Sequence, residues 1–387
     1  MFHIATPEEI LKGKITDIYF VRTLEVLRAK NKNPAVVAEI CAKGFPLNWE
    51  WGVFAGLEEV IELLKDLPVK VKAFPEGTLF KAGEPLFIIE GNYNDFALFE
   101  TAVLGFLCQA SGIATQAARC RKLAGDKPIL NFGARRMHPA ISPMIDRSSF
   151  IGGCDGVSVI KSAEFLDEPP QGTMPHSLIL IFGDTLKAVK AFNEVISSQI
   201  KRVALIDTFQ DEKFESIRVA KALGKELFAV RLDTPSSRRG NFLDILREVR
   251  WELDIRGFKD VKLFVSGGID EKAIISLNGY ADAYGIGTFI SNAPVIDFSF
   301  DIVEINGRAI SKKGKHSGRK EILICTNCRL RKVIFASDPL PECSCGGNFE
   351  RPLTLILENK ETVVNIPSPQ ELRKKVLNQL SFVEISL

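Results

Sequence analysis

The sequence has few histidines, almost no net charge and no long apolar run, and each shortage excludes a class of protein. Its 50 Lys and Arg side chains stand against 48 Asp and Glu, which leaves a formal net charge of +2. A chain so balanced has no overall attraction for nucleic acid or for an anionic membrane surface. Any anion that it binds must therefore meet a local site.

The N-terminal residues MFHIATPEEILKGKITDIYF lack the basic stretch and small-residue cleavage site of an export signal. Apolar runs such as LILIF are much shorter than the roughly 20 residues that a membrane-spanning helix needs. We therefore expect a cytoplasmic protein. With 46% hydrophobic and 25% charged residues, the 387-residue chain has enough apolar material for two or three folded domains.

Residues 1–127 mix helical and strand patterns and predict an α+β sandwich domain. The segment VKVKAFPEGTLFKAGEPLFIIEG alternates apolar and polar residues around two turn signals, which predicts a small antiparallel sheet. The segment NDFALFETAVLGFLCQASGIATQAARCRKLAG predicts a long buried helix, with Asn94 or Asp95 as its N-cap and Gly125 as its stop. Residues 297–312 predict a hairpin, turning at Asn-Gly, that rejoins this sheet.

Between residues 128 and 296, short apolar runs alternate with helical patterns. The runs are PILNFGARR, GVSVI, GTMPHSLIL, RVALIDTF, LFAVRLDT, KLFVSGGI and AYGIGT. Continuous apolar strands separated by helices indicate a parallel sheet that is buried on both faces. A doubly wound sheet and a closed barrel both fit. Because nearly every run ends in polar or glycine residues, where barrel enzymes place their sites, we predict an irregular TIM-like α/β barrel.

Two glycine-containing segments follow the last two predicted strands and are typical of phosphate binding. VSGGID contains Ser266, Gly267 and Gly268, and GIGT contains Gly287 and Thr288. Paired glycines let backbone N–H groups approach a phosphate, and barrels often hold phosphate at these two strands.

Charged and aromatic residues follow two other predicted strands. RLDTPSSRRG contains Arg231, Asp233 and Ser236, and NFGARRMHP contains Phe132 with two arginines, Arg135 and Arg136. Arginine binds phosphates or carboxylates bidentately, and aspartate suits a ribose hydroxyl or a magnesium ion. A surface ion-pair network is the alternative interpretation. Together the strand ends predict a site for a phosphate-bearing sugar and a planar acid.

One of the four histidines, His176, follows Gly172 and Thr173 in GTMPHSLIL, at the expected mouth of a strand. We expect Thr173 of this segment to contact the substrate. A carboxylate such as Asp207 in LIDT would orient its imidazole and leave the other nitrogen free as a nucleophile or proton carrier. A hydrogen-bonded core histidine is the alternative.

Four of the eight cysteines cluster near the C-terminus: Cys325 and Cys328 in CTNC, and Cys343 and Cys345 in CSCGG. Two close pairs of thiolates are typical of a tetrahedral zinc site, and the glycines after the second pair free the backbone to fold around the metal. We expect residues 320–387 to form a small zinc-knuckle-like module with a structural metal. An unmetallated thiol cluster and disulfides are the alternatives.

The motifs FLCQASGIAT, FGARR, RLDTPS and GTMPH make the chain, from about Asp17 to Thr288, resemble the nicotinate phosphoribosyltransferases of the type II class in their archaeal form. The resemblance implies that phosphoribosyl pyrophosphate and nicotinate give nicotinate mononucleotide and pyrophosphate in NAD salvage. It also implies catalytic Mg²⁺ and ATP hydrolysis that is coupled through a phosphorylated histidine.

The same resemblance implies a role for individual residues. His176 would accept the phosphoryl group and Asp207 would hold its imidazole. Tyr19 would reach into the site of the partner subunit of a homodimer and sandwich the pyridine ring against Phe132. A ring of dimers, up to a hexamer, stays open.

The remaining implied contacts are to the acid, the sugar and its phosphates. Arg135 or Arg136, with Arg231, would bind the nicotinate carboxylate or the sugar phosphate. Asp155 and Asp233 would contact ribose or magnesium, and the two glycine segments would cradle the 5′-phosphate.

Other functions remain alternatives at this point. The paired arginines favour an acid over nicotinamide, and the GTMPH segment disfavours quinolinate. A zinc-containing nucleic-acid or protein-binding adaptor would use the basic linker SKKGKHSGRK, yet no basic or aromatic pattern extends beyond that linker. An aldolase-like barrel would need a Schiff-base lysine, for which Lys161 is the candidate. The chain has no P-loop for ATP.

Overall fold

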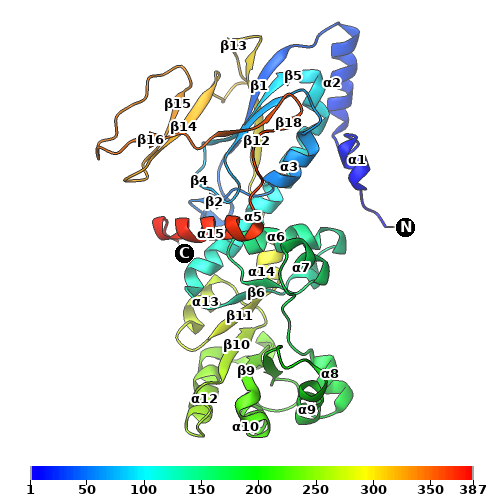
Figure 1. Ribbon diagram of the computed structural model, residues 1–387, viewed down its shortest axis with the longest axis vertical. Helices are drawn as coiled ribbons and strands as arrows, with labels where there is room; N and C mark the ends of the chain where they lie inside the picture. Colours follow the sequence, from blue (N-terminus) through cyan, green and yellow to red (C-terminus); the bar gives the residue numbers. More distant parts are fainter. Residues whose placement is uncertain (1, 386–387) are drawn as a thin grey trace. The chain divides into compact units, whose positions relative to one another are not determined.

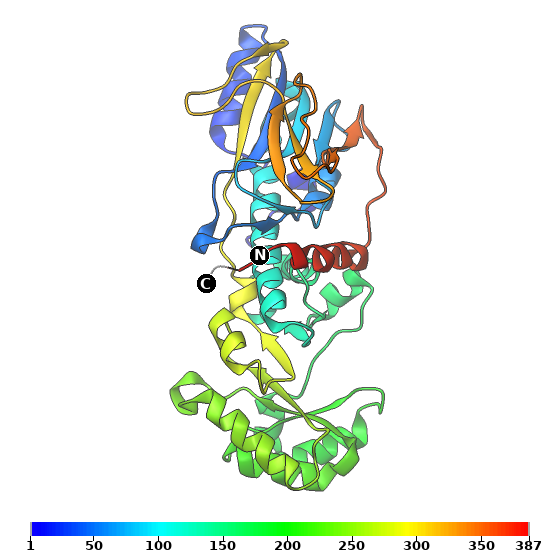
Figure 2. The same ribbon diagram turned by 90° about the vertical axis from the view of Figure 1, so that its left-hand side faces the viewer.

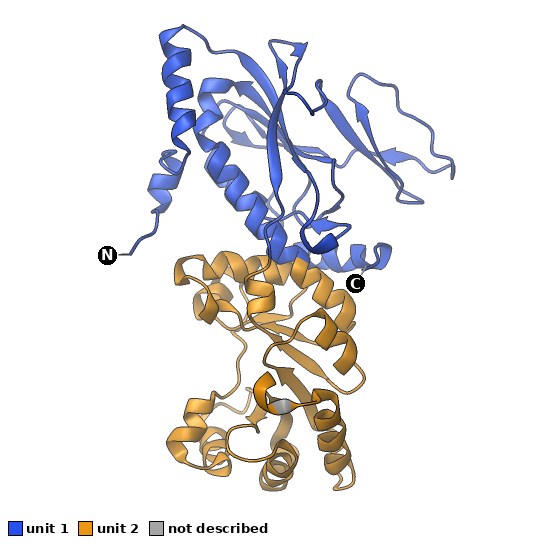
Figure 3. Ribbon diagram, turned by 180° about the vertical axis from the view of Figure 1, so that it is seen from behind, with its two compact units in different colours: residues 1–115, 294–387 blue, residues 116–293 orange. Residues whose placement is uncertain are grey.

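The computed structural model describes residues 2–385, except for the side chain of Arg239. The chain forms two compact units, coloured separately in Figure 3. Unit 1 comprises Met1–Thr115 and Pro294–Leu387, and unit 2 comprises Gln116–Ala293. The first unit therefore ends inside a helix, α5 (Glu100–Ala124), rather than at residue 127.

Unit 1 is built on a seven-stranded sheet with the order β13-β12-β1-β5-β3-β17-β18 (Figure 1). The β12-β13 hairpin turns at Asn306-Gly307 and β12 pairs with β1, so the chain returns to its first sheet as predicted. The strands are β1 (Ala35–Ala42), β3 (Lys70–Ala73), β5 (Pro85–Asn92), β12 (Phe298–Ile305), β13 (Arg308–Ala309), β17 (Thr354–Glu358) and β18 (Glu361–Thr362).

The core of unit 1 lies against this sheet and is rich in phenylalanine. Alternate residues along the strands face it, and fully buried side chains include Ile40, Val71 and Phe87. A two-stranded sheet, β2 (Gly52–Val53) with β4 (Leu79–Phe80), adds further apolar side chains. The helices before α5 are α1 (Pro7–Leu11), α2 (Ile18–Ala29), η1 (Pro46–Asn48), α3 (Leu57–Leu64), α4 (Tyr93–Phe96) and η2 (Ala97–Phe99).

The segment predicted as one long helix is α4, η2 and α5 in succession. Its N-cap is Asn92 rather than Asn94 or Asp95, and it ends before Gly125, which adopts a positive φ of 65° as predicted for a stop. By length and composition Tyr93–Ala124 would suffice to cross a membrane, which the inspection of short runs missed. Half of its most apolar window is buried inside the protein.

The predicted module 320–387 divides its strands between two sheets. β14 (Lys320–Cys325), β15 (Arg331–Phe335) and β16 (Phe349–Glu350) form a separate sheet, whereas β17 and β18 join the main one. Helix α15 (Pro369–Gln379) is followed by η6 (Leu380–Phe382). In α15, Lys375 donates to Thr78 Oγ1 at 2.7 Å and Gln379 donates to the Gly77 carbonyl at 2.8 Å, so the C-terminal helix is fixed to unit 1.

Unit 2 contains a parallel sheet of six strands in the order β7-β6-β11-β10-β9-β8. Among the described residues β7 and β8 are its two edges and do not pair, so the closed barrel was wrong and the sheet is a half-barrel within a mixed α/β fold. The strands are β6 (Ile129–Asn131), β7 (Gly156–Val157), β8 (Arg202–Leu205), β9 (Leu227–Leu232), β10 (Lys262–Ser266) and β11 (Ala283–Ile286).

The missing strand is the predicted one at GTMPHSLIL, which is instead helix α8 (His176–Phe182). Pro175 precedes its first residue and Gly183, with a φ of 69°, ends it, and these are helix boundary signals that the continuous apolar run obscured. The apolar side chains of Leu180 and Ile181 are exposed rather than packed in a sheet.

Helices connect the strands of unit 2 (Figure 2), and α10 packs against both α12 and β9. They are η3 (Ala134–Arg136), η4 (Pro139–Ile141), α6 (Ser142–Ile151), α7 (Ile160–Leu166), α9 (Thr185–Val195), α10 (Glu212–Leu223), η5 (Gly224–Glu226), α11 (Ser236–Arg239), α12 (Phe242–Asp254), α13 (Glu271–Leu277) and α14 (Thr288–Ser291).

Two glycines in α5 predict opposite effects of the same substitution. A Cβ at Gly112 would lie 2.2 Å from the Pro294 carbonyl oxygen, so Gly112→Ala forces backbone apart and should lower the free energy of unfolding by about 1–3 kcal/mol. A Cβ at Gly105 meets nothing within 4 Å, so Gly105→Ala should raise it by up to about 1 kcal/mol. Denaturant unfolding measures both, and equal effects would contradict the close approach at Gly112.

Candidate active site

The carboxyl ends of four neighbouring strands, β6, β11, β10 and β9, carry most of the predicted site residues. Phe132 follows β6, Gly287 follows β11, Ser266 ends β10 and Asp233 follows β9. Because parallel strands point the same way, these ends meet at one edge of the sheet. The structure thus brings together segments that are more than 150 residues apart in sequence.

Arg231 is the hub of this edge. Its guanidinium donates to Thr173 Oγ1 at 2.6 Å, Ser266 Oγ at 2.9 Å and Asp233 Oδ2 at 3.0 Å. Ser266 in turn donates to the other carboxylate oxygen of Asp233 at 2.8 Å. Four predicted residues therefore form one charge-assisted network, which the sequence placed near each other but did not connect.

The ring of Phe132 lies beside this network, with the Arg231 guanidinium carbon 5.4 Å from the ring centroid. A Cβ at Gly285 would lie 2.6 Å from the ring, so glycine at that strand position gives the ring its place. The ring centroid of Phe264 is 5.9 Å away. Together Phe132 and Arg231 offer an aromatic face and a cation, a combination that suits a flat anion.

His176 is the first residue of α8 and its side chain is 41% exposed, so it is reachable from solvent. Its Nδ1 lies 3.0 Å from Thr208 Oγ1. Its Nε2 lies 3.6 Å from Asp233 Oδ2 and 3.9 Å from Asp207 Oδ2. The predicted proximity of His176 and Asp207 is thus present, and Thr208, the residue after Asp207 in the LIDT motif, is a partner that the sequence reasoning missed.

Asp207 is almost fully buried, with 1% of its side chain exposed. Neither carboxylate oxygen accepts a hydrogen bond from another residue in the described part of the chain. Burial raises the pKa of Asp207 to about 6, although the nearby His176 opposes this shift. A buried carboxylate without donors is costly unless a cation faces it, and the group that faces Asp207 here is the imidazole of His176.

The glycines that follow β10 adopt conformations that other residues rarely take. Gly267 and Gly268 have φ angles of 84° and 67°. A Cβ at Gly267 would lie 2.9 Å from the Asp233 carbonyl oxygen, so the loop packs directly on the segment after β9. Gly287, the N-cap of α14, and Thr288, its first residue, follow the neighbouring strand β11.

Other predicted residues lie apart from this network. Asp155 accepts from Arg121 and, at 2.7 Å, from the N–H of Ile129, the first residue of β6, so it lies at the amino end of the sheet and not with the site. Ser236 is exposed in α11.

Three further predicted residues are exposed as well. Arg135 and Arg136 lie in η3 directly after Phe132. Tyr19 belongs to unit 1, where its hydroxyl donates to Asp17 at 3.3 Å.

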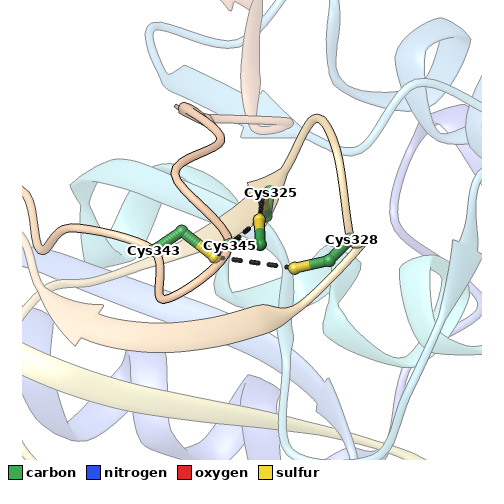
Figure 4. A group of neighbouring side chains, drawn as sticks. All are labelled: Cys325, Cys328, Cys343 and Cys345. Carbon is green, nitrogen blue, oxygen red and sulfur yellow. Dashed lines mark hydrogen bonds between the residues drawn. The ribbon is translucent and has the colours of Figure 1, made fainter.

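The four C-terminal cysteines converge in unit 1, as Figure 4 shows. Their sulfur atoms all lie within 4.8 Å of one another, and the Cys325–Cys345 and Cys328–Cys343 distances are both 3.5 Å. A Cβ at Gly347 would lie 2.8 Å from Cys325 Sγ, so glycine leaves room for the cluster. The donor set and spacing fit a tetrahedral zinc ion.

Comparison with known proteins identifies the family. The sequence profile of the quinolinate phosphoribosyl transferase N-terminal domain matches residues 17–111, and that of the C-terminal domain matches residues 113–301. The nicotinate phosphoribosyltransferase pncB1 of Mycobacterium tuberculosis is 28% identical, over 80% of this chain and 78% of its own length. That of Bacillus subtilis is 27% identical, over 75% of this chain and 66% of its own length.

Solved structures agree with this assignment. The nicotinate-nucleotide pyrophosphorylase of Pyrococcus furiosus is 52% identical, with a TM-score of 0.97 and 99% of both chains covered. The human nicotinic acid phosphoribosyltransferase shares the fold, with a TM-score of 0.73 at 20% identity over 96% of this chain and 94% of its own. The chain therefore belongs to the nicotinate and quinolinate phosphoribosyltransferase family of enzymes.

Proposed function

We propose that this enzyme transfers the phosphoribosyl group of phosphoribosyl pyrophosphate to nicotinate in NAD salvage, and that ATP hydrolysis is coupled to the transfer through phosphorylated His176. The names of the curated relatives support nicotinate as the acceptor. The observation that carries the ATP coupling is the exposed imidazole of His176, held between Thr208 and the carboxylates of Asp207 and Asp233.

The acceptor site is best explained by a flat monoanion. The Phe132 ring provides one face for a pyridine ring. The guanidinium of Arg231 lies over the Phe132 ring as a fixed cation. Arg231 already has three partners, so the exposed Arg135 or Arg136 would supply the donors for the nicotinate carboxylate.

The donor site would use the loops after β10 and β11. Backbone N–H groups of Gly267, Gly268 and Gly287, with the hydroxyl of Thr288, would hold the 5′-phosphate. Asp233 would contact the ribose hydroxyls or a Mg²⁺ ion, and such an ion would supply charge stabilisation for the departing pyrophosphate. Asp207 would support His176.

In the transfer, the nicotinate ring nitrogen forms a bond to the anomeric carbon of the ribose while the bond from that carbon to the pyrophosphate oxygen breaks. The pyrophosphate leaves with the electron pair. Positive charge develops on the ribose ring, so carboxylates beside the sugar and cations beside the phosphates stabilise the transition state. The pyridine nitrogen carries its own lone pair, and no residue has to remove a proton from it.

In the coupling step, a nitrogen of the neutral His176 ring attacks the γ-phosphorus of ATP, and the bond to the ADP oxygen breaks. Asp207 and Asp233 balance the positive charge that the ring then carries. Water later releases the phosphoryl group. The phosphorylated and free forms would differ in their affinity for phosphoribosyl pyrophosphate, which is how the hydrolysis of ATP acts on the transfer.

The remaining assignments belong to the same proposal. A homodimer, alone or in a hexamer, would bring Tyr19 of one subunit against the pyridine held by Phe132 of the other. The four-cysteine cluster would hold a structural zinc ion that fastens β14 to β16. We expect the enzyme to act in the cytoplasm and to bind neither nucleic acid nor a membrane.

The direct test of the acceptor is product formation from phosphoribosyl pyrophosphate and Mg²⁺ with nicotinate, nicotinamide or quinolinate, each with and without ATP. We expect nicotinate mononucleotide from nicotinate, formed faster with ATP, and turnover of the other two pyridines at least about tenfold slower. Release of carbon dioxide from quinolinate at the higher rate would instead assign the enzyme to the quinolinate branch.

The pH dependence of the ATP stimulation tests the role of Asp207. Since its pKa is raised to about 6, the carboxylate becomes charged, and able to support His176, only as the pH rises through about 6. We expect the stimulation to increase with a midpoint there, and Asp207→Asn to abolish it at every pH. Asp146→Asn is the matched control, because burial also raises the pKa of Asp146 to about 6.

The same shift has a consequence for stability. The folded chain binds the Asp207 proton more tightly than the unfolded chain, whose carboxyl has a pKa of 3.8. The stabilisation that the protonated Asp207 gives the folded chain is therefore complete below pH 3.8 and is lost as the pH rises to about 6.

For the preceding prediction, a stimulation by ATP that does not change between pH 5 and pH 8 would contradict the assignment of Asp207.

A further inference from the structure

A buried ion pair lies next to the loop Ser266–Asp270 of unit 2, which the proposal assigns to phosphate binding, and the pair has no part in the reaction as proposed. Arg119, near the end of α5, donates from Nε to Glu271 Oε1 at 2.7 Å and from a terminal nitrogen to Oε2 at 2.9 Å. Gln116 Nε2 donates to the same carboxylate at 2.9 Å. The Arg119 side chain is 3% exposed and that of Glu271 is 13% exposed.

Glu271 directly follows the loop formed by Ser266–Asp270, which contains both positive-φ glycines. At its other end, Ser266 is bonded to Arg231 and Asp233. The loop is thus fixed at its start by the Arg231 network and at its end by Arg119. Between those points, Gly267 and Gly268 have positive φ angles, Ile269 is 2% exposed and Asp270 caps α13 by accepting from the Ala273 N–H, so Arg119 is one of several attachments near this loop.

The pair also sets the charge behind the loop. A carboxylate that is largely buried, with few water molecules to screen it, acts strongly on its neighbours. Without Arg119, the Glu271 carboxylate would be an uncompensated negative charge next to a loop that is to receive phosphate. With Arg119 bound bidentately, the two formal charges cancel and the backbone N–H groups determine what binds.

We propose that Arg119 is a positioning residue for phosphoribosyl pyrophosphate: it neutralises Glu271, so that the Ser266–Asp270 loop receives the donor's phosphate without an unpaired negative charge behind it. This inference rests on the proposed function, because it assumes that the loop binds that phosphate. It also gives a physical task to the end of the helix that carries the SGIAT segment: Gln116 and Arg119 follow that segment in α5 and reach the loop from behind.

The test compares the KM values of both substrates in Arg119→Met, Glu271→Gln and the double variant. Arg119→Met should raise the KM for phosphoribosyl pyrophosphate by about tenfold or more, the usual scale for a residue that supports a site from behind. The KM for nicotinate should change by less than about twofold. Glu271→Gln should not raise the KM for phosphoribosyl pyrophosphate, and the double variant should return to within about threefold of the wild type.

Arg121→Met is the matched control. Arg121 lies two residues further along α5, is also largely buried and is paired with Asp155 at the amino end of the sheet. Its loss should lower stability without a selective change in the KM for phosphoribosyl pyrophosphate. If Arg119→Met fails to fold, Arg119→Lys takes its place: it keeps the charge but loses the bidentate pairing, and the KM should stay within about threefold of the wild type because the loop requires the charge.

A merely structural ion pair gives a different pattern. Arg119→Met and Glu271→Gln would then change the KM for phosphoribosyl pyrophosphate in the same direction, both substrates would be affected alike, and the double variant would show no recovery. That result overturns the proposal while the wild-type enzyme still makes nicotinate mononucleotide. If the wild type neither turns over nor binds phosphoribosyl pyrophosphate by calorimetry, the proposed function and this inference both fall.

Discussion

The guanidinium of Arg231 holds the site together. It stands at the end of β9 and donates to Thr173, Ser266 and Asp233, three residues from three separate segments. Since a largely buried guanidinium needs partners for its donors, the segments are fixed relative to one another before any substrate arrives. The aromatic face of Phe132 and the imidazole of His176 take their places around this network.

Local sequence predicted those parts of the site whose position follows from the strand they end. Glycine pairs, arginines and aspartates after apolar runs were placed at the correct edge because parallel strands share one direction. Asp155, which only the family resemblance suggested, lies at the opposite edge, because its neighbouring strand β7 begins only after it. His176 was found by its rarity, although the segment around it is a helix and not a strand.

Contacts between distant segments could not be predicted from the sequence. The pairing of Arg119 with Glu271 joins residues 152 positions apart, and no periodicity points to it. Closure of a sheet is equally non-local: six strands with two free edges among the described residues look the same in sequence as a barrel. The cysteine cluster was predictable because both of its halves are short motifs, while the division of residues 320–387 between two sheets was not.

The most direct measurement is the phosphorylation of the enzyme by ATP labelled at the γ-phosphate. If His176 couples ATP to the transfer, the wild type will carry label that is stable to base and labile to acid, on the peptide that contains His176. Phosphoribosyl pyrophosphate and nicotinate will speed its loss, and His176→Gln will carry none. Absence of label from the wild type, or label that persists in His176→Gln, would contradict the role of this histidine.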